Sequence, residues 1–179
     1  MDAQSNIQSL FLEQLHEGCP ALTPAVGQAM AEAAAVCLEA VGYLSEVDLF
    51  ATGDYTAQYN LTWNMVTEQM RRSHNDLEEA TEHGACGIAI LLIRDLIGYT
   101  VIERARKGSG IDYWLGIEEE FPFQRRGLLE VSGILRGDES IINARVRQKM
   151  DQSARSEGQY TAYIVVVEFS RAVVRVVKK

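Results

Sequence analysis

The first part of the chain carries two kinds of hydrophobic pattern. Apolar residues recur at helical spacing over 5–16 and 24–41, and Thr23–Pro24 opens the second segment as a typical N-cap followed by proline at the first helical position. Over 46–62 apolar and polar residues alternate on both sides of a Thr-Gly-Asp turn, which predicts a β-hairpin. A short helix is expected over 64–74. This part of the chain is therefore predicted to form helices and one hairpin.

The rest of the chain predicts a regular succession of elements. A long helix precedes three strands, a second helix and a strand rich in β-branched residues, and a last strand or extension ends the chain. The expected bounds are 76–97, 99–106, 111–117, 128–135, 139–153, 160–169 and 171–177. We therefore predict an α/β (α+β) protein with a central mixed β-sheet flanked by helices.

Composition supports one globular domain of ordinary size. The chain has 179 residues, of which 47% are apolar and 23% are charged, which excludes disorder as the overall state. No apolar run reaches the roughly 18 residues of a membrane helix, and the N-terminus lacks the pattern of a secretion signal. Cys19, Cys37 and Cys86 are odd in number and widely spaced, so we expect no disulfide framework and a cytoplasmic location.

Charge is distributed unevenly along the chain. Residues 1–82 contain 13 acidic and two basic residues, whereas 83–179 contain 12 acidic and 15 basic residues. The second half can therefore tolerate a polyanion, although a strong nucleic-acid binder usually shows a plain basic excess. The overall net charge of −8 does not exclude DNA as a partner.

Three carboxylates occupy positions where a buried face is expected. Glu82 lies on the stripe of the long helix that continues through Ala85 and Ala89, Asp112 follows a glycine-rich turn at the start of a strand, and Glu130 lies inside an otherwise apolar strand. A carboxylate on an inward face is costly unless it is paired, hydrogen-bonded or bound to a metal ion. Acids from two neighbouring strands and from the helix packed on them can converge on one Mg²⁺, which prefers oxygen ligands.

Each carboxylate also has an ordinary alternative. Asp112 could cap backbone amides near the turn that precedes it, and the other two could form ion pairs. The candidate partners are Arg104 or Arg136 for Glu130, and Arg71 or Arg72 for Glu82.

The element order and two short motifs resemble the PD-(D/E)XK nuclease superfamily. Gly110-Ile111-Asp112 is similar to the segment that carries its strand-borne aspartate, Leu129-Glu130-Val131-Ser132 to its Glu-x-Lys strand, and Glu82 to a helical acid present in many members. The resemblance covers about residues 76–170. It implies a restriction-endonuclease-like core of order helix-strand-strand-strand-helix-strand within 76–179, preceded by an N-terminal helical and hairpin extension, 1–75, that packs on it.

The resemblance further implies hydrolysis of DNA phosphodiesters with Mg²⁺ or Mn²⁺. Asp112 and Glu130 match the metal ligands, and Glu82 would be a third ligand or would orient a metal-bound water. It also suggests a bacterial setting in antiphage defence or mobile-element control.

The chain departs from the superfamily at one position, because Ser132 stands where the motif has lysine. A serine cannot supply positive charge, so the cation would come from Lys149 on the following helix or from Lys107 in the hairpin turn; Arg145 and Arg147 share that helix. Alternatively, the site is inactive and the fold serves as a scaffold. It would then bind a protein partner through its acidic N-terminal half, or a second copy of the chain.

Overall fold

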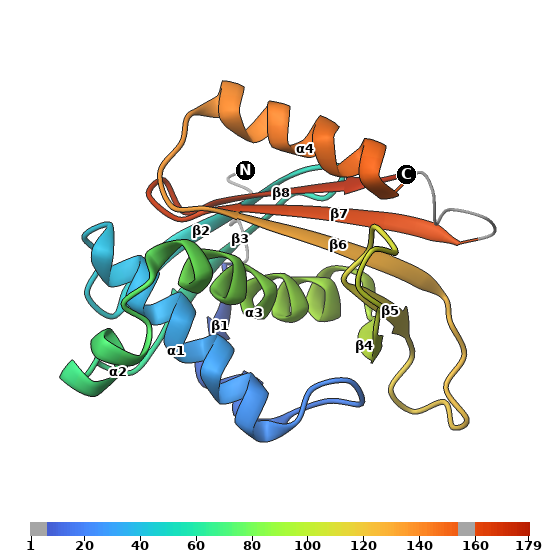
Figure 1. The fold of residues 1–179 in the computed structure, drawn as a ribbon, viewed down its shortest axis with the longest axis horizontal. Coiled ribbons are helices and arrows are strands. Elements are labelled where there is room, and N and C mark those ends of the chain that lie inside the picture. Colours follow the sequence, from blue (N-terminus) through green and yellow to red (C-terminus); the bar gives the residue numbers. More distant parts are fainter. Residues whose placement is uncertain (1–6, 154–159) are drawn as a thin grey trace, which may run out of the picture.

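The computed structural model describes residues 7–153 and 160–179, which form one mixed sheet of eight strands with helices on both faces (Figure 1). The predicted α/β class is confirmed. The order across the sheet is β1–β3–β2–β8–β7–β6–β5–β4. The strands are β1 (Gln8–Phe11), β2 (Glu46–Gly53), β3 (Ala57–Thr62), β4 (Thr100–Arg104), β5 (Tyr113–Gly116), β6 (Gly127–Ile134), β7 (Thr161–Glu168) and β8 (Val173–Lys178). The helices are η1 (Leu12–Glu17), α1 (Pro24–Ala40), α2 (Glu68–Ser73), α3 (Leu77–Ile97) and α4 (Glu139–Ser153).

The helices form two layers around the sheet. In Figure 1, α1 and α3 cover one face and α4 covers the other. In chain order α3 is followed by β4, β5, β6, α4 and β7. The strands β4, β5 and β6 pair antiparallel, and β7 pairs parallel to β6, so α4 is the crossover between two parallel neighbours.

The N-terminal strands continue the same sheet. β2 pairs parallel with β8, while β3 pairs antiparallel with β2. The boundary expected at residue 75 falls between α2 and α3, and the sheet extends across both sides of it. Strands from 1–75 and 76–179 thus share one continuous set of backbone hydrogen bonds.

The predicted helix over 5–16 is wrong for the first half of its described part. Residues 8–11 form β1, which pairs parallel with β3, and only Leu12–Glu17 is helical, as a 3₁₀ helix. Residues 5 and 6 lie outside the described residues. Leu10 is buried and its neighbours on β1 are exposed, so the same apolar residues that suit a helix also suit an edge strand.

The helix expected from Asn64 begins later. The side chain of Thr67 accepts a hydrogen bond from the backbone N–H of Met70, and α2 therefore starts at Glu68. The helices expected over 24–41, 76–97 and 139–153 are present within one or two residues of their predicted ends.

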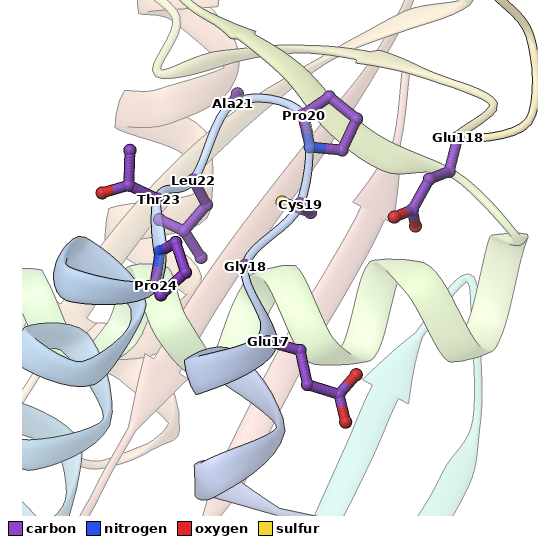
Figure 2. A pocket seen from close by; sticks show the side chains of 9 residues that line it. All are labelled: Glu17, Gly18, Cys19, Pro20, Ala21, Leu22, Thr23, Pro24 and Glu118. Atoms are coloured by element: carbon purple, nitrogen blue, oxygen red, sulfur yellow. The ribbon is translucent and has the colours of Figure 1, made fainter.

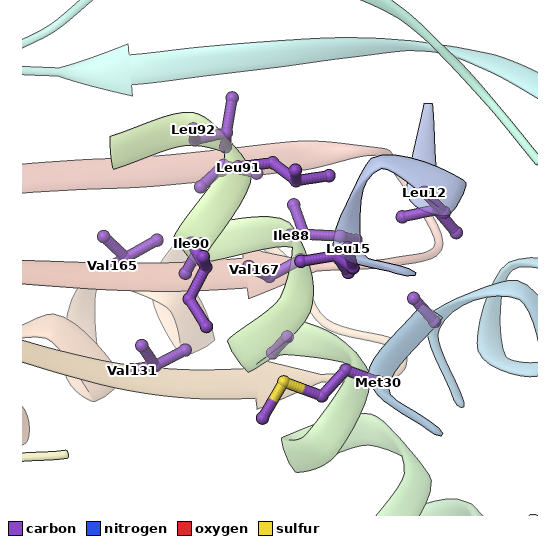
Figure 3. Packing of buried hydrophobic residues seen from close by; sticks show 14 of the residues in the cluster. Leu12, Leu15, Met30, Ile88, Ile90, Leu91, Leu92, Val131, Val165 and Val167 are labelled. Carbon is purple, nitrogen blue, oxygen red and sulfur yellow. The ribbon is translucent and has the colours of Figure 1, made fainter. Parts of the chain in front are cut away.

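The larger core lies between the sheet and the paired helices α1 and α3. Figure 3 shows Leu15 beside Ile88 of α3; Met30 and the strand residues Val131, Val165 and Val167 belong to the same cluster. The two helices pack closely, because a Cβ added at Gly84 would lie 2.7 Å from the Cα of Ala34. The stripe of small residues in α1 thus serves contact with α3.

The second, smaller core lies under α4. Ile142 and Val146 of this helix pack on Leu128 of β6 and on Ile164 and Val166 of β7. Successive residues of β6 therefore face the two helical layers in turn. In the part of the chain that the structure describes, no helix has both the length and the apolar character needed to cross a membrane.

Candidate functional site

The site begins where β5 leaves β6. The two strands are in register only from Tyr113 opposite Leu129 to Leu115 opposite Gly127, and the N–H of Asp112 makes one further bond, 2.9 Å, to the carbonyl of Leu129. β6 continues to Ile134, paired with β7 along its whole length. Beyond residue 129, the β5 side of β6 has lost its neighbouring strand.

Two of the predicted carboxylates take the place of that strand. The N–H of Val131 donates to Oδ2 of Asp112 at 2.8 Å, and the N–H of Gly133 donates to Oε2 of Glu82 at 3.0 Å. A backbone N–H left without a partner is costly, so both carboxylates stabilise this edge of the sheet. Asp112 thus accepts a hydrogen bond from a backbone amide, as its alternative interpretation predicts. The amide belongs to Val131 of β6, however, and not to the preceding turn.

Glu130 directly precedes the capped Val131 and faces the opposite layer, which contains α4. Its carboxylate is buried and accepts a bond of 2.6 Å from Nζ of Lys149 on α4. Burial, followed by the nearby charge of Asp112, raises the pKa of Glu130 to about 7, against the opposing effect of Lys149. The two carboxyl groups line the same cavity. The expected pairing of Glu130 with Arg104 or Arg136 is wrong.

Ser132 has a cation beside it despite its lack of charge. Nη1 of Arg145 donates to the hydroxyl of Ser132 at 2.6 Å and lies 3.6 Å from Oε1 of Glu82. The Ser132 hydroxyl also donates to Glu82 at 3.3 Å. The alternative pairing of Glu82 with Arg71 or Arg72 is wrong, because α3 turns Glu82 toward α4.

Glu82 is more exposed than its helical position suggests. Its side chain is 51% exposed, whereas Thr81, Gly84 and Ala85 are buried. The buried face of α3 includes Thr81. The carbonyl oxygen of Thr81 would lie 2.4 Å from a Cβ added at Gly133 of β6. Glu82 therefore lies beside the stripe, where its carboxylate reaches the exposed edge of β6.

Asp112 has a basic neighbour of its own. Nη2 of Arg104 lies 3.5 Å from Oδ1 of Asp112, and the same guanidinium stacks 4.6 Å from the ring centre of Tyr113. Each of the three carboxylates is thus accompanied by a different cation.

A cavity of about 610 Å³ opens beside these groups. Asp112, Glu82 and Lys149 lie in its wall together with residues of α1 and of the loop before it. A neighbouring cavity of about 500 Å³ is lined by Asp112, Glu130 and Lys107, so the hairpin-turn lysine shares a cavity with both carboxylates.

A third hollow, shown in Figure 2, lacks this mixture of charges. It has a volume of about 470 Å³ and is lined by residues 17–24 and Glu118. Its charged side chains, Glu17 and Glu118, are both acidic. It therefore offers no cation to a phosphate group.

The carboxylates form a pair with an outlying third member. Asp112 and Glu130 line one cavity, whereas Glu82 caps an amide two residues further along β6, about 7 Å away by the rise of a strand. Within 7–153 and 160–179, no group of three or more His, Cys, Asp or Glu side chains could hold a metal ion. The pair itself fits Mg²⁺, which commonly uses one or two carboxylates and completes its shell with water and phosphate oxygens.

A sequence signal for the cations of α4 exists. Arg145 and Lys149 are one helical turn apart, about 6 Å, which matches the two-residue spacing of Ser132 and Glu130 on a strand. Because α4 follows β6 and runs back along it, the order reverses: Arg145 meets Ser132 and Lys149 meets Glu130. Lys149 was expected here from its place on the helix; the contact of Arg145 with Ser132 needed the tertiary structure.

No family model, curated protein or solved structure matches this chain.

Proposed function

We propose that the protein is a divergent nuclease of the PD-(D/E)XK type that hydrolyses DNA phosphodiesters with Mg²⁺ or Mn²⁺. The observation that supports it best is the carboxylate pair Asp112–Glu130, in contact with Lys149 and placed where β5 leaves β6. Two carboxyl groups held together in a partly buried site repel each other when both are ionised, and a divalent cation relieves that repulsion. A bacterial role in antiphage defence or mobile-element control belongs to the same proposal.

Asp112 and Glu130 are the residues that would hold the metal ion. When bound, such an ion supplies a Lewis acid and lowers the pKa of its water. Asp112 is held in place by the N–H of Val131, and Glu130 by Lys149. These contacts keep both carboxylates oriented before any ligand arrives.

Positive charge for the phosphate comes from α4 in this proposal. Lys149 lies between Glu130 and the larger cavity, where its ammonium group can neutralise a phosphate oxygen. Arg145 brings a guanidinium to Ser132 and so stands where the superfamily motif has its strand lysine. Lys107, in the wall of the neighbouring cavity, is a second candidate from the hairpin turn. Glu82 positions Arg145 and the Gly133 amide, and could orient a water.

The test is cleavage of end-labelled single-stranded and double-stranded DNA with Mg²⁺ or Mn²⁺. Asp112→Asn, Glu130→Gln and Lys149→Met are each expected to lower the cleavage rate about 10²-fold or more, and Lys149→Arg to restore part of it. Arg147→Met is the matched control, because Arg147 is an exposed residue of the same helix. Cleavage that persists in the Asp112→Asn/Glu130→Gln double variant would contradict the proposal.

A second candidate function is a non-catalytic interaction module. Its supporting observation is that each carboxylate already has a basic partner, and that two of them cap backbone amides. In that case the acidic first 82 residues would bind a basic protein partner, or two copies would associate. A folded wild-type protein that neither cleaves DNA nor binds Mn²⁺ in calorimetry would favour this alternative.

The cellular location remains an inference from the cysteines. Cys19, Cys37 and Cys86 are all free thiols in the structure. This agrees with a reducing compartment such as the cytoplasm, which we propose as its setting.

A further inference from the structure

The larger cavity beside Asp112 has an apolar wall that the nuclease proposal does not use. Ala21, Val26 and Met30, from the loop before α1 and from its first turns, form this wall. None of these residues belongs to the segment that resembles the nuclease core. With a volume of about 610 Å³, the cavity is in the size range of small-molecule sites.

Charged residues from other elements also line the cavity. Asp112, Lys149 and Arg104 line the cavity, and Asp112 is shared with the neighbouring cavity that Glu130 also lines. The cavity therefore offers cations and a carboxylate from β4, the start of β5 and α4 to an anionic group, and apolar side chains from α1 to a flat apolar body. A nucleotide has this division, with a phosphate at one end and a base at the other.

Polar groups of the cavity can contact the edge of a base. His83 and Glu79 of α3 both line the cavity. The imidazole of His83 has two ring nitrogens that can form hydrogen bonds with the edge of a base. A carboxylate such as Glu79 accepts from the amino group of a base.

We propose that this cavity binds a single unpaired nucleotide of the substrate, with its base against Val26 and Met30 and its phosphate toward Asp112 and Lys149. This inference rests on the proposed function and names its substrate class: single-stranded DNA, frayed ends or flaps. A base inside a duplex is stacked between its neighbours and must leave the stack before it can enter such a pocket. Intact duplex is therefore the poorer substrate.

Binding of small probes tests the cavity separately from catalysis. Thymidine 5′-monophosphate, deoxyadenosine 5′-monophosphate and inorganic phosphate are titrated into the protein by calorimetry, once with Mg²⁺ and once with EDTA. The nucleotides are expected to bind about tenfold or more tightly than phosphate, because only they can contact the apolar wall. Equal affinities for nucleotide and phosphate would overturn the proposal.

Val26→Trp fills the cavity from α1 without changing any charged residue. Val26 is exposed enough, at 42%, to accept a larger side chain. Nucleotide affinity is expected to fall about tenfold or more, with binding of phosphate unchanged. Ala25→Trp is the matched control, because Ala25 is an exposed neighbour that does not line the cavity. Val26→Glu, which places a charge where the base would lie, gives a second variant if the tryptophan proves unstable.

The outcomes separate the two proposals. Weaker nucleotide binding by Val26→Trp but not by Ala25→Trp, together with preferred cleavage of single strands, supports both. Nucleotide binding by a protein that cleaves no DNA supports the cavity and contradicts the nuclease. Cleavage of DNA by Val26→Trp at the wild-type rate, with unchanged nucleotide affinity, overturns the cavity and leaves the nuclease standing.

Discussion

The two halves of β6 have different surroundings, although they belong to one continuous strand. Residues 127–129 are paired with β5 on one side and β7 on the other, whereas 131–133 are paired only with β7. In the first half, the backbone groups therefore find their hydrogen-bond partners in the two neighbouring strands. In the second half, carboxylates from the start of β5 and from α3 accept the N–H groups instead.

This difference explains why charge gathers at one place on an otherwise apolar sheet. An edge amide needs an acceptor, and a carboxylate is a stronger acceptor than a neutral carbonyl group. The carboxylates then need cations, which α4 and β4 supply through Lys149, Arg145 and Arg104. The structural requirement and the proposed chemistry thus use the same residues, and substitutions that separate the two are the informative ones.

The largest expected loss of stability comes from adding a methyl group at Gly133, in the second half of β6. A Cβ at Gly133 would lie 2.4 Å from the carbonyl oxygen of Thr81, so Gly133→Ala must push α3 away from the sheet. We expect a loss of about 3 kcal/mol in the free energy of unfolding, measured by urea denaturation.

Gly127→Ala is the matched change in the first half of the strand. Its Cβ would meet its nearest neighbour, the carbonyl oxygen of Thr161, at 3.1 Å, so a smaller loss of about 1 kcal/mol is expected. Equal losses for the two variants would show that the halves of β6 do not differ in their packing.

The pH dependence of stability tests the buried carboxylate between the halves. The pKa of Glu130 is raised to about 7, so the folded protein holds this proton more tightly than the unfolded chain does. The free energy of unfolding is therefore expected to fall as the pH rises from about 4.5 to about 7, and then to level off, by about 3 kcal/mol at most.

Urea unfolding of wild type and Glu130→Gln at several pH values measures this contribution. The variant should lack the decrease, since glutamine does not titrate. Glu119→Gln changes an exposed acid and should keep the wild-type profile. If the free energy of unfolding changed with pH in the same way for the wild type and Glu130→Gln, the result would contradict the raised pKa of Glu130.

The smallest effects concern the two caps. Asp112→Ala leaves the N–H of Val131 without an acceptor and is expected to cost about 1–2 kcal/mol, whereas Asp112→Asn keeps an acceptor oxygen and should restore most of that stability. Cleavage should be lost in both, because asparagine is a poor substitute for a metal-binding carboxylate.

Glu82→Ala should cost less, about 0.5 kcal/mol, because water can replace this exposed side chain at Gly133. Amide hydrogen exchange reads both caps directly. Val131 should exchange faster in Asp112→Ala only, and Gly133 in Glu82→Ala only. Acceleration of both amides in either variant would mean that the edge opens as a unit.

Local sequence patterns predicted much of the fold correctly. The N-cap at Thr23, the C-terminal Gly98 in the left-handed conformation and the alternation over 46–62 place their elements correctly, because each depends on neighbours in the chain. The strand β1 was missed because it exists through pairing with β3, about 50 residues away.

For the candidate site, too, the sequence predicted some features and the tertiary structure was needed for others. Asp112 and Glu130 could be selected from the sequence because a carboxylate in an apolar strand is costly, and that rule needs no partner to be known. Which cation each carboxylate meets, and that Glu82 is exposed beside the stripe, depend on how α3 and α4 lie on β6.

The amino-acid order by itself determined the α/β class, most element positions and the three acids worth attention, because these follow from periodicity and from the cost of burying charge. Only the tertiary structure decided that β5 separates from β6 at Asp112, that Arg145 reaches Ser132, and that α1 lines a cavity beside Asp112. These features join segments distant in the chain, and their energies depend on distances that no local pattern contains.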